Sequence, residues 1–113
     1  MSKVTQTKLF GGTVTATGNG AVYGFGAQNA VFVLDITAAS GTTPTITVLV
    51  EEYDETSNSY ATVDTFPAQT GVARVRRTVV GNTTPFGNKL RVSWTVGGTT
   101  PSFTFTVSAH DKP

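Results

Sequence analysis

The sequence contains no cysteine, and this absence removes several kinds of chemistry at once. A chain without thiols forms no disulfide, offers no thiolate nucleophile and binds no zinc through sulfur. The absence agrees with a reducing compartment, although many exported proteins also lack cysteine.

Charged residues are scarce as well. They make up 13% of the chain, and the formal net charge is +1. This balance carries no electrostatic signature for nucleic acid or for an anionic membrane, so we expect neither as a partner. A surface on which threonine, serine, asparagine and glycine replace charges is unusual for a free monomer. It suggests that part of the surface meets other protein in an assembly.

Long apolar runs are also missing. No stretch approaches the roughly 20 apolar residues of a membrane-spanning helix. The first ten residues, MSKVTQTKLF, carry lysine but no apolar run behind it, so no secretory signal is expected. We therefore expect a soluble protein that is made in a cytoplasm.

Helical periodicity is absent, because no window places apolar residues at spacings of three and four beside good helix formers. Threonine, about a fifth of the chain, and valine favour pleated strands, since both are branched at Cβ. Glycine or proline interrupts the chain roughly every ten residues, which is typical of short strands. A chain of 113 residues is one domain by length. We predict an all-β fold, a single antiparallel β-sandwich of jelly-roll or immunoglobulin-like type with roughly eight to nine short strands.

The expected domain organisation is simple. Residues 1–12 form an N-terminal arm or a first strand, and residues 13–113 form the sandwich. Gly11 and Gly12 are expected to break the first strand, and Gly18, Asn19 and Gly20 give a tight-turn signal. The predicted strands are 4–10, 13–17, 21–25, 30–37, 45–52, 60–66, 72–80, 90–96 and 102–109.

Alternation assigns the faces of three strands. Along each of them, every second residue is apolar, and the residues between are mostly threonine or serine. Successive side chains of a strand point to opposite faces, so the apolar sets are predicted to fill the core. These sets are Ile46, Val48 and Val50; Leu90, Val92, Trp94 and Val96; and Phe103, Phe105 and Val107.

A short motif occurs twice: GTTPTITV begins at Gly41, and GTTPSFTF begins at Gly98. Glycine supplies unusual backbone angles in a turn, and proline suits the first residue of a strand or an edge. Each Gly-Thr-Thr-Pro is therefore predicted to join two strands as a hairpin. An internal duplication and independent selection of a good turn both remain open as the origin of the repeat.

The candidate partner contacts are basic or lie in the N-terminal segment: Lys8, Phe10, Arg74, Arg76 and Arg77. Arg74 and Arg76 share one face of their predicted strand, and Arg77 faces the other way. Arginines here can pair with an acidic partner or with phosphate. Charges that deter unwanted pairing at an edge strand are the competing interpretation, and we favour it.

Other candidate catalytic or metal-binding residues favour ordinary interpretations. His110 lies close to the end of the chain, where residues are commonly mobile and exposed. The acidic cluster of Glu51, Glu52, Asp54 and Glu55 could serve a glycosidase or a calcium site, but its spacing fits a solvated hairpin tip better. We predict no catalytic residue, no metal site and no cofactor.

Asp35 and the aromatic residues also favour ordinary structural interpretations. Asp35 alternates with Leu34 and Ile36 and is expected to face solvent. Trp94, with the tyrosines at positions 23, 53 and 60, could line a sugar-binding face. Trp94 has the parity of the apolar set, however, so we predict that it lies in the core.

Three segments carry a resemblance to a known group of proteins: LDITAASGTTPTITVLVEEYD (residues 34–54), FPAQTG (66–71) and LRVSWTVGGTTPSFTFTVSA (90–109). They resemble segments of small β-sandwich structural proteins from the virions of tailed bacteriophages. The similarity covers roughly residues 30–110, and its motifs are those of turns and strands.

The resemblance implies a non-enzymatic role in the virion. It suggests a capsid decoration, or cement, protein that is made in the host cytoplasm and binds the outer surface of the assembled capsid. Its partners would be the major capsid protein and copies of itself, with a homo-oligomer such as a trimer expected. A tail or head–tail accessory protein is the alternative within this group, and a carbohydrate-binding or adhesion module is the alternative outside it.

Overall fold

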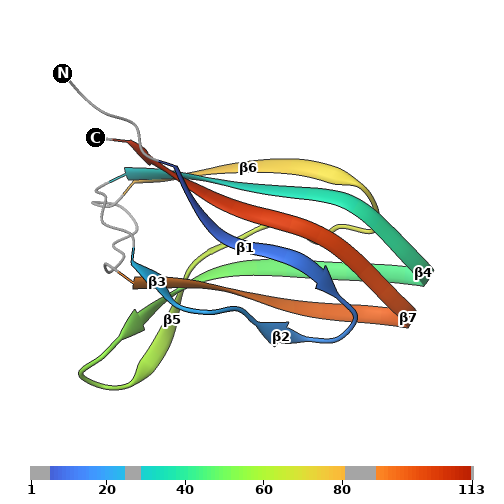
Figure 1. Cartoon of the computed structure of the whole chain (residues 1–113), viewed down its shortest axis with the longest axis horizontal. Helices are drawn as coiled ribbons and strands as arrows, with labels where there is room; N and C mark the ends of the chain where they lie inside the picture. The colour runs from blue at the N-terminus through green and yellow to red at the C-terminus, as the bar shows by residue number, and fades with distance from the viewer. Residues whose placement is uncertain (1–5, 25–28, 81–88, 113) are drawn as a thin grey trace.

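A computed structural model describes residues 6–24, 29–80 and 89–112, and these residues form one curled antiparallel β-sheet (Figure 1). The all-β prediction is confirmed over these ranges. Among the described residues there is no helix long and apolar enough to cross a membrane. The strands are β1 (Gln6–Val14), β2 (Gly18–Asn19), β3 (Tyr23–Gly24), β4 (Asn29–Asp54), β5 (Ser59–Thr65), β6 (Ala73–Val80) and β7 (Lys89–Lys112).

Two long strands organise the sheet. β4 and β7 run antiparallel beside each other, from the pair Asn29 and Lys112 to the pair Glu52 and Leu90. β6 pairs with residues 29–36 of β4, and β5 pairs with residues 49–54. β1, β2 and β3 all pair with β7 on its other side. The sheet therefore has a central pair of strands and shorter strands at its edges.

Both long strands bend sharply at the same end of the molecule (Figure 1). The bend divides the sheet into an upper part, made of β6, β1, residues 29–40 of β4 and residues 102–112 of β7, and a lower part. The lower part contains β5, β2, β3, residues 45–54 of β4 and residues 89–97 of β7. The two parts face each other, because the ring of Phe10 in the upper part lies 4.5 Å from that of Trp94 in the lower part.

The two Gly-Thr-Thr-Pro segments are the corners at this bend. The hairpin interpretation is wrong, because the strand segments on either side of each motif pair with the other long strand and not with each other. The corners lie side by side, with Ser40 opposite Ser102 and Thr42 opposite Thr99. Local turn chemistry therefore predicted a change of direction correctly, but it did not reveal which strands would pair.

The corners also pack against each other reciprocally. Gly41 has φ 117° and Gly98 has φ 104°, backbone angles that side-chain-bearing residues rarely adopt. A Cβ on Gly41 would lie 2.8 Å from the carbonyl oxygen of Thr100, and one on Gly98 would lie 2.6 Å from that of Thr43. Thr43 and Thr100 have positive φ values of 48° and 46°. The repeated motif thus builds two matching halves of one contact.

The core fills the space between the two parts of the sheet. The alternation prediction is confirmed, because three apolar sets from β4 and β7 belong to one buried cluster, with Val96 partly buried against it. Phe105 contacts both Phe10 and Trp94, with ring centroids 5.0 and 5.8 Å away. Trp94 is only 7% exposed, which confirms the prediction that it is a core residue.

The prediction of eight to nine short strands is not confirmed. The described residues contain seven strands, because 30–37 and 45–52 belong to one strand, and 90–96 and 102–109 to another. Gly11 and Gly12 do not end the first strand, since β1 continues through them to Val14 along β7. Continuous backbone pairing outweighs the low strand propensity of glycine here. Of the predicted segment 1–12, residues 1–5 lie outside the described ranges.

Candidate binding surface

The outward side of the upper part of the sheet is the candidate binding surface, which we call the basic face. Antiparallel partners share one side of a sheet, so the register defines its members. Val33 of β4 lies opposite Arg76 of β6 and Ser108 of β7, and Ser108 lies opposite Lys8 of β1. The basic face comprises Gln6, Lys8, Val31, Val33, Asp35, Arg74, Arg76, Thr78, Thr106, Ser108 and His110.

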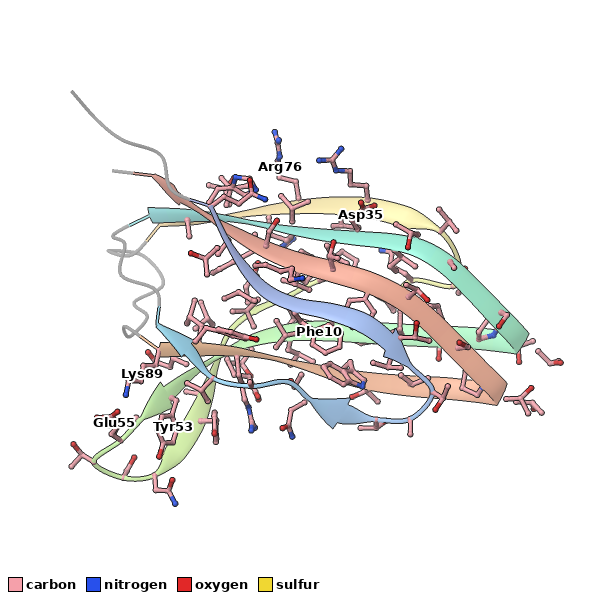
Figure 2. The ribbon with its side chains drawn as sticks, viewed as in Figure 1. Phe10, Asp35, Tyr53, Glu55, Arg76 and Lys89 are labelled. Atoms are coloured by element: carbon pink, nitrogen blue, oxygen red, sulfur yellow. The ribbon has the colours of Figure 1, made fainter. Side chains whose placement is uncertain are left out.

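Three predicted contact residues lie together on this face. Lys8 is at the β1 edge, and Arg74 and Arg76 are at the β6 edge, all three exposed. Figure 2 shows Arg76 pointing outward from the ribbon. Within the described ranges, none of the three makes an ion pair with a carboxylate. Their charges are therefore available to a partner.

The middle of the face is less polar. Val33 points away from the core, yet it is only 6% exposed, and Val31 beside it is half-buried. Asp35 is half-buried between Arg74 and Thr106, on the outward side as predicted (Figure 2). The face thus has an apolar centre, one carboxylate and cations at both edges.

Phe10 and Arg77 are the two predicted contact residues that lie elsewhere. Phe10 points into the space between the two parts of the sheet and packs on the core (Figure 2). Arg77 donates two hydrogen bonds to Asp64 of β5, from Nε at 3.2 Å and from Nη2 at 3.1 Å. These bonds and the charge of Asp64 raise the pKa of Arg77. Arg77 therefore ties β6 to β5.

His110 lies within β7, between Val31 and Gln6, and is half-buried. The expectation of an exposed terminal residue is wrong, because strand pairing continues to Lys112. Its Nε2 lies 3.4 Å from Oγ of Ser108. That distance is at the long end for a hydrogen bond, so the contact holds the ring loosely on the basic face.

The acidic cluster lies at the β4–β5 hairpin, where separate interactions engage three of its carboxylates. Arg91 of β7 donates from Nε to Oε1 of Glu51 over 2.8 Å, and Lys89 pairs with Glu55 (Figure 2). Asp54 accepts hydrogen bonds from Oγ of Ser57 at 2.8 Å and from the amide of Thr56 at 3.1 Å. The hairpin-tip interpretation agrees with these contacts. No group of three or more metal-ligating side chains occurs among the described residues.

The aromatic residues do not form one platform. Tyr53 and Tyr60 contact each other with ring centroids 4.9 Å apart, and the guanidinium of Arg91 lies 3.3 Å from the Tyr60 centroid. Trp94 is buried, and its Nε1 donates to the carbonyl of Ala16 over 2.9 Å. Arg91 therefore occupies ring surface that a sugar would need.

Sequence reasoning missed Arg91 and the Arg77–Asp64 pair. Arg91 lies opposite Glu51, and that partnership depends on the register of β4 against β7. Alternation indicated the outward side of Arg91, but it could not identify the partner across the strands. Asp64 is thirteen residues from Arg77 in sequence, on a strand that does not pair with β6.

Comparisons with protein-family models, with curated proteins and with solved structures find no significant match.

Proposed function

We propose that the protein is a non-enzymatic structural component of a bacteriophage virion, a decoration protein that binds the outer surface of the capsid. The basic face carries this proposal. Lys8, Arg74 and Arg76 are exposed on one side of a sheet whose other side carries the hydrophobic core. A rigid sheet with cations at its edges and valines at its centre suits docking against an acidic protein surface.

The positions of the charged and apolar residues on this face predict what each group contributes to binding. Cations at the rim of an interface steer association and select the partner, whereas affinity comes mainly from the packed centre. Val31 is the accessible apolar residue of that centre, beside the nearly covered Val33, and Asp35 adds one half-buried carboxylate. Binding is therefore expected to weaken as salt is added, because rim charges are screened over about 10 Å at 0.1 M ionic strength.

We also propose the finer architecture and the assembly state. The curled sheet is interpreted as a two-layered β-sandwich of the jelly-roll or immunoglobulin-like class, supported by the packing of Phe10 on Trp94 across the core. Copies of the protein associate with one another on the capsid, with a trimer as the expected form. A turnover activity that survives rigorous purification would contradict the non-enzymatic role.

The test is co-sedimentation with capsids that have been stripped of the protein. The purified protein is expected to pellet with these capsids, and protein left wholly in the supernatant would refute the proposal. A variant with Lys8→Ser, Arg74→Ser and Arg76→Ser is expected to bind at least about tenfold more weakly, since each lost contact at an interface rim is worth a fraction of a kcal/mol to about 1 kcal/mol.

The matched control changes the net charge equally on the opposite outer side. Thr62→Glu, Thr65→Glu and Thr95→Glu lie on the lower part of the sheet, at exposed positions. This variant is expected to retain at least half of the binding. An equal loss in both variants would show that net charge, and not the basic face, determines binding.

A further inference from the structure

Among the described strands, β6 has a long edge with which no strand pairs. It pairs with β4 on one side, and no other strand of the described chain pairs with it. None of the additional backbone hydrogen bonds within the described residues reaches β6. In an antiparallel ladder, every second residue of an edge strand directs its N–H and C=O away from its neighbour. The outer edge of β6 therefore offers backbone donors and acceptors to another strand.

β6 is more regular than the other edges of the sheet. Its eight residues pair with β4 without a register shift, from Ala73 opposite Ile36 to Val80 opposite Asn29. The β1–β7 ladder has a shift between Lys8 and Phe10, and the β4–β5 ladder has one between Val50 and Glu51. Bulges twist an edge and hinder the addition of a strand. Among the described strands, β6 therefore has the edge that is best suited to pair with an added strand.

The charges on β6 determine which kind of strand can pair with its open edge. Arg74 and Arg76 stand two residues apart on the basic face and make no ion pair in the described structure. Asp35 is the carboxylate across the ladder from Arg74, on the side of β6 away from the open edge. Two copies of β6 placed side by side would bring these arginines together, and like charges across strands are destabilising. A strand with carboxylates at alternate positions would place them opposite the arginines. Val72, which is 70% exposed just before β6, adds an apolar contact.

We propose that β6 binds an extended acidic segment of the protein's partner, which adds to the sheet as a further strand. The segment carries two carboxylates two residues apart, and these face Arg74 and Arg76. Main-chain hydrogen bonds supply affinity in this mode, and alternate side chains supply specificity. This inference rests on the proposed docking function, because it names the chemistry of the partner segment at one edge of the basic face.

The test uses the full chain labelled with ¹⁵N and a short peptide of valine and threonine with two aspartates two positions apart. Amide hydrogen exchange is expected to slow at every second residue of β6 by at least about tenfold when the peptide is in excess. Two control peptides are expected not to slow exchange in β6. One has lysines in place of the aspartates, and the other is acidic but N-methylated at alternate positions.

Two variants of the protein distinguish binding at the β6 edge from docking across the whole basic face. Arg74→Ser with Arg76→Ser is expected to weaken binding of the acidic peptide about tenfold. Lys8→Ser, on the same face but at the opposite edge, is expected to change the affinity for this peptide less than twofold. An equal loss with Lys8→Ser would overturn the inference in favour of docking across the face. Absence of binding, or binding without alternate protection of β6, would also overturn it.

The capsid experiment distinguishes this inference from the proposed function. Sedimentation with capsids but no strand addition would leave the decoration role intact and refute the acidic-strand mode. If the acidic peptide adds as a strand but the protein does not bind capsids, acidic-strand binding at β6 would be supported and the decoration role refuted.

Discussion

Gly41 and Gly98 show how two single residues determine the position of a corner. Each combines a positive φ with an absent Cβ, and each touches the backbone of the other Gly-Thr-Thr-Pro segment. The sequence indicated both glycines as turn residues. It could not indicate that the two turns contact each other, because Gly41 meets Thr100 and Gly98 meets Thr43, 59 and 55 positions apart. These contacts depend on the register of β4 and β7.

Gly41→Ala is expected to lower the free energy of unfolding by about 2–4 kcal/mol, since the new methyl group meets a carbonyl oxygen and the backbone angle is strained. Gly98→Ala is expected to do the same. Gly71→Ala is the control, because a Cβ there has no neighbour within 4 Å. Urea denaturation measures all three. A corner variant within about 0.5 kcal/mol of the unmodified protein would contradict the reciprocal packing.

Asp54 should make the β4–β5 hairpin sensitive to acid. The hydroxyl of Ser57 and the amide of Thr56 donate to its carboxylate and hold its pKa below the usual 3.8. A lowered pKa in the folded state stabilises the turn fully above the unfolded value, and this contribution is lost as the pH falls through the folded value. Amide exchange at Thr56 is therefore expected to rise in that acidic range. In Asp54→Asn it should show no such step beyond the intrinsic pH dependence of exchange.

At the scale of the element, β4 and β7 show what alternation can and cannot predict. The inward residues were predicted on both sides of the corner in β7 and after the corner in β4, because burial of one side imposes a period of two. The continuity of the strands through the corners was not predicted. Glycine and proline normally end a strand, but here each bend is supported by the other strand.

Trp94 anchors the segment between β1 and β2. Its Nε1 donates to the carbonyl of Ala16, and the amide of Val96 donates to Oγ1 of Thr17 over 3.0 Å. Trp94→Phe keeps an aromatic ring in the core but removes the first bond. We expect the free energy of unfolding to fall by about 1–3 kcal/mol, since the carbonyl of Ala16 loses its donor and the smaller ring leaves a gap in the core.

Hydrogen exchange of residues 15–20 provides the specific readout for this variant. Exchange is expected to accelerate there more than in β4. The control is Thr17→Ala, which removes the second bond without changing the core and should accelerate the same segment. Uniform acceleration across the whole sheet would show that Trp94 acts through the core alone.

At the scale of the whole molecule, one cluster joins both parts of the curled sheet. The all-β class and about half of the core residues could be predicted, because they follow from composition and alternation. The basic face could be predicted only in part. The parity of Arg74 and Arg76 was readable along their own strand, whereas their position beside Lys8 depends on β4 and β7 lying between them.

Phe105 tests whether the two parts unfold together. It is fully buried and contacts both Phe10 and Trp94, so Phe105→Ala is expected to lower the free energy of unfolding by about 3–5 kcal/mol. The adjacent Thr106→Ala, on the exposed side, should cost less than about 0.5 kcal/mol. Near-UV circular dichroism and far-UV circular dichroism should lose their signals in one transition. Separate transitions would show that the upper and lower parts are independent.

The central place of β7 has a consequence for synthesis. Residues 102–112 lie between β4 and β1 in the upper part of the sheet, and they are made after every other described strand. A nascent chain therefore holds β1 and the start of β4 without their shared neighbour until residues 102–112 have been made. Most pairings in this sheet join distant residues, which is typical of slow folders. The earlier strands should thus stay largely unpaired until β7 is complete, and exposed strands at that stage favour aggregation.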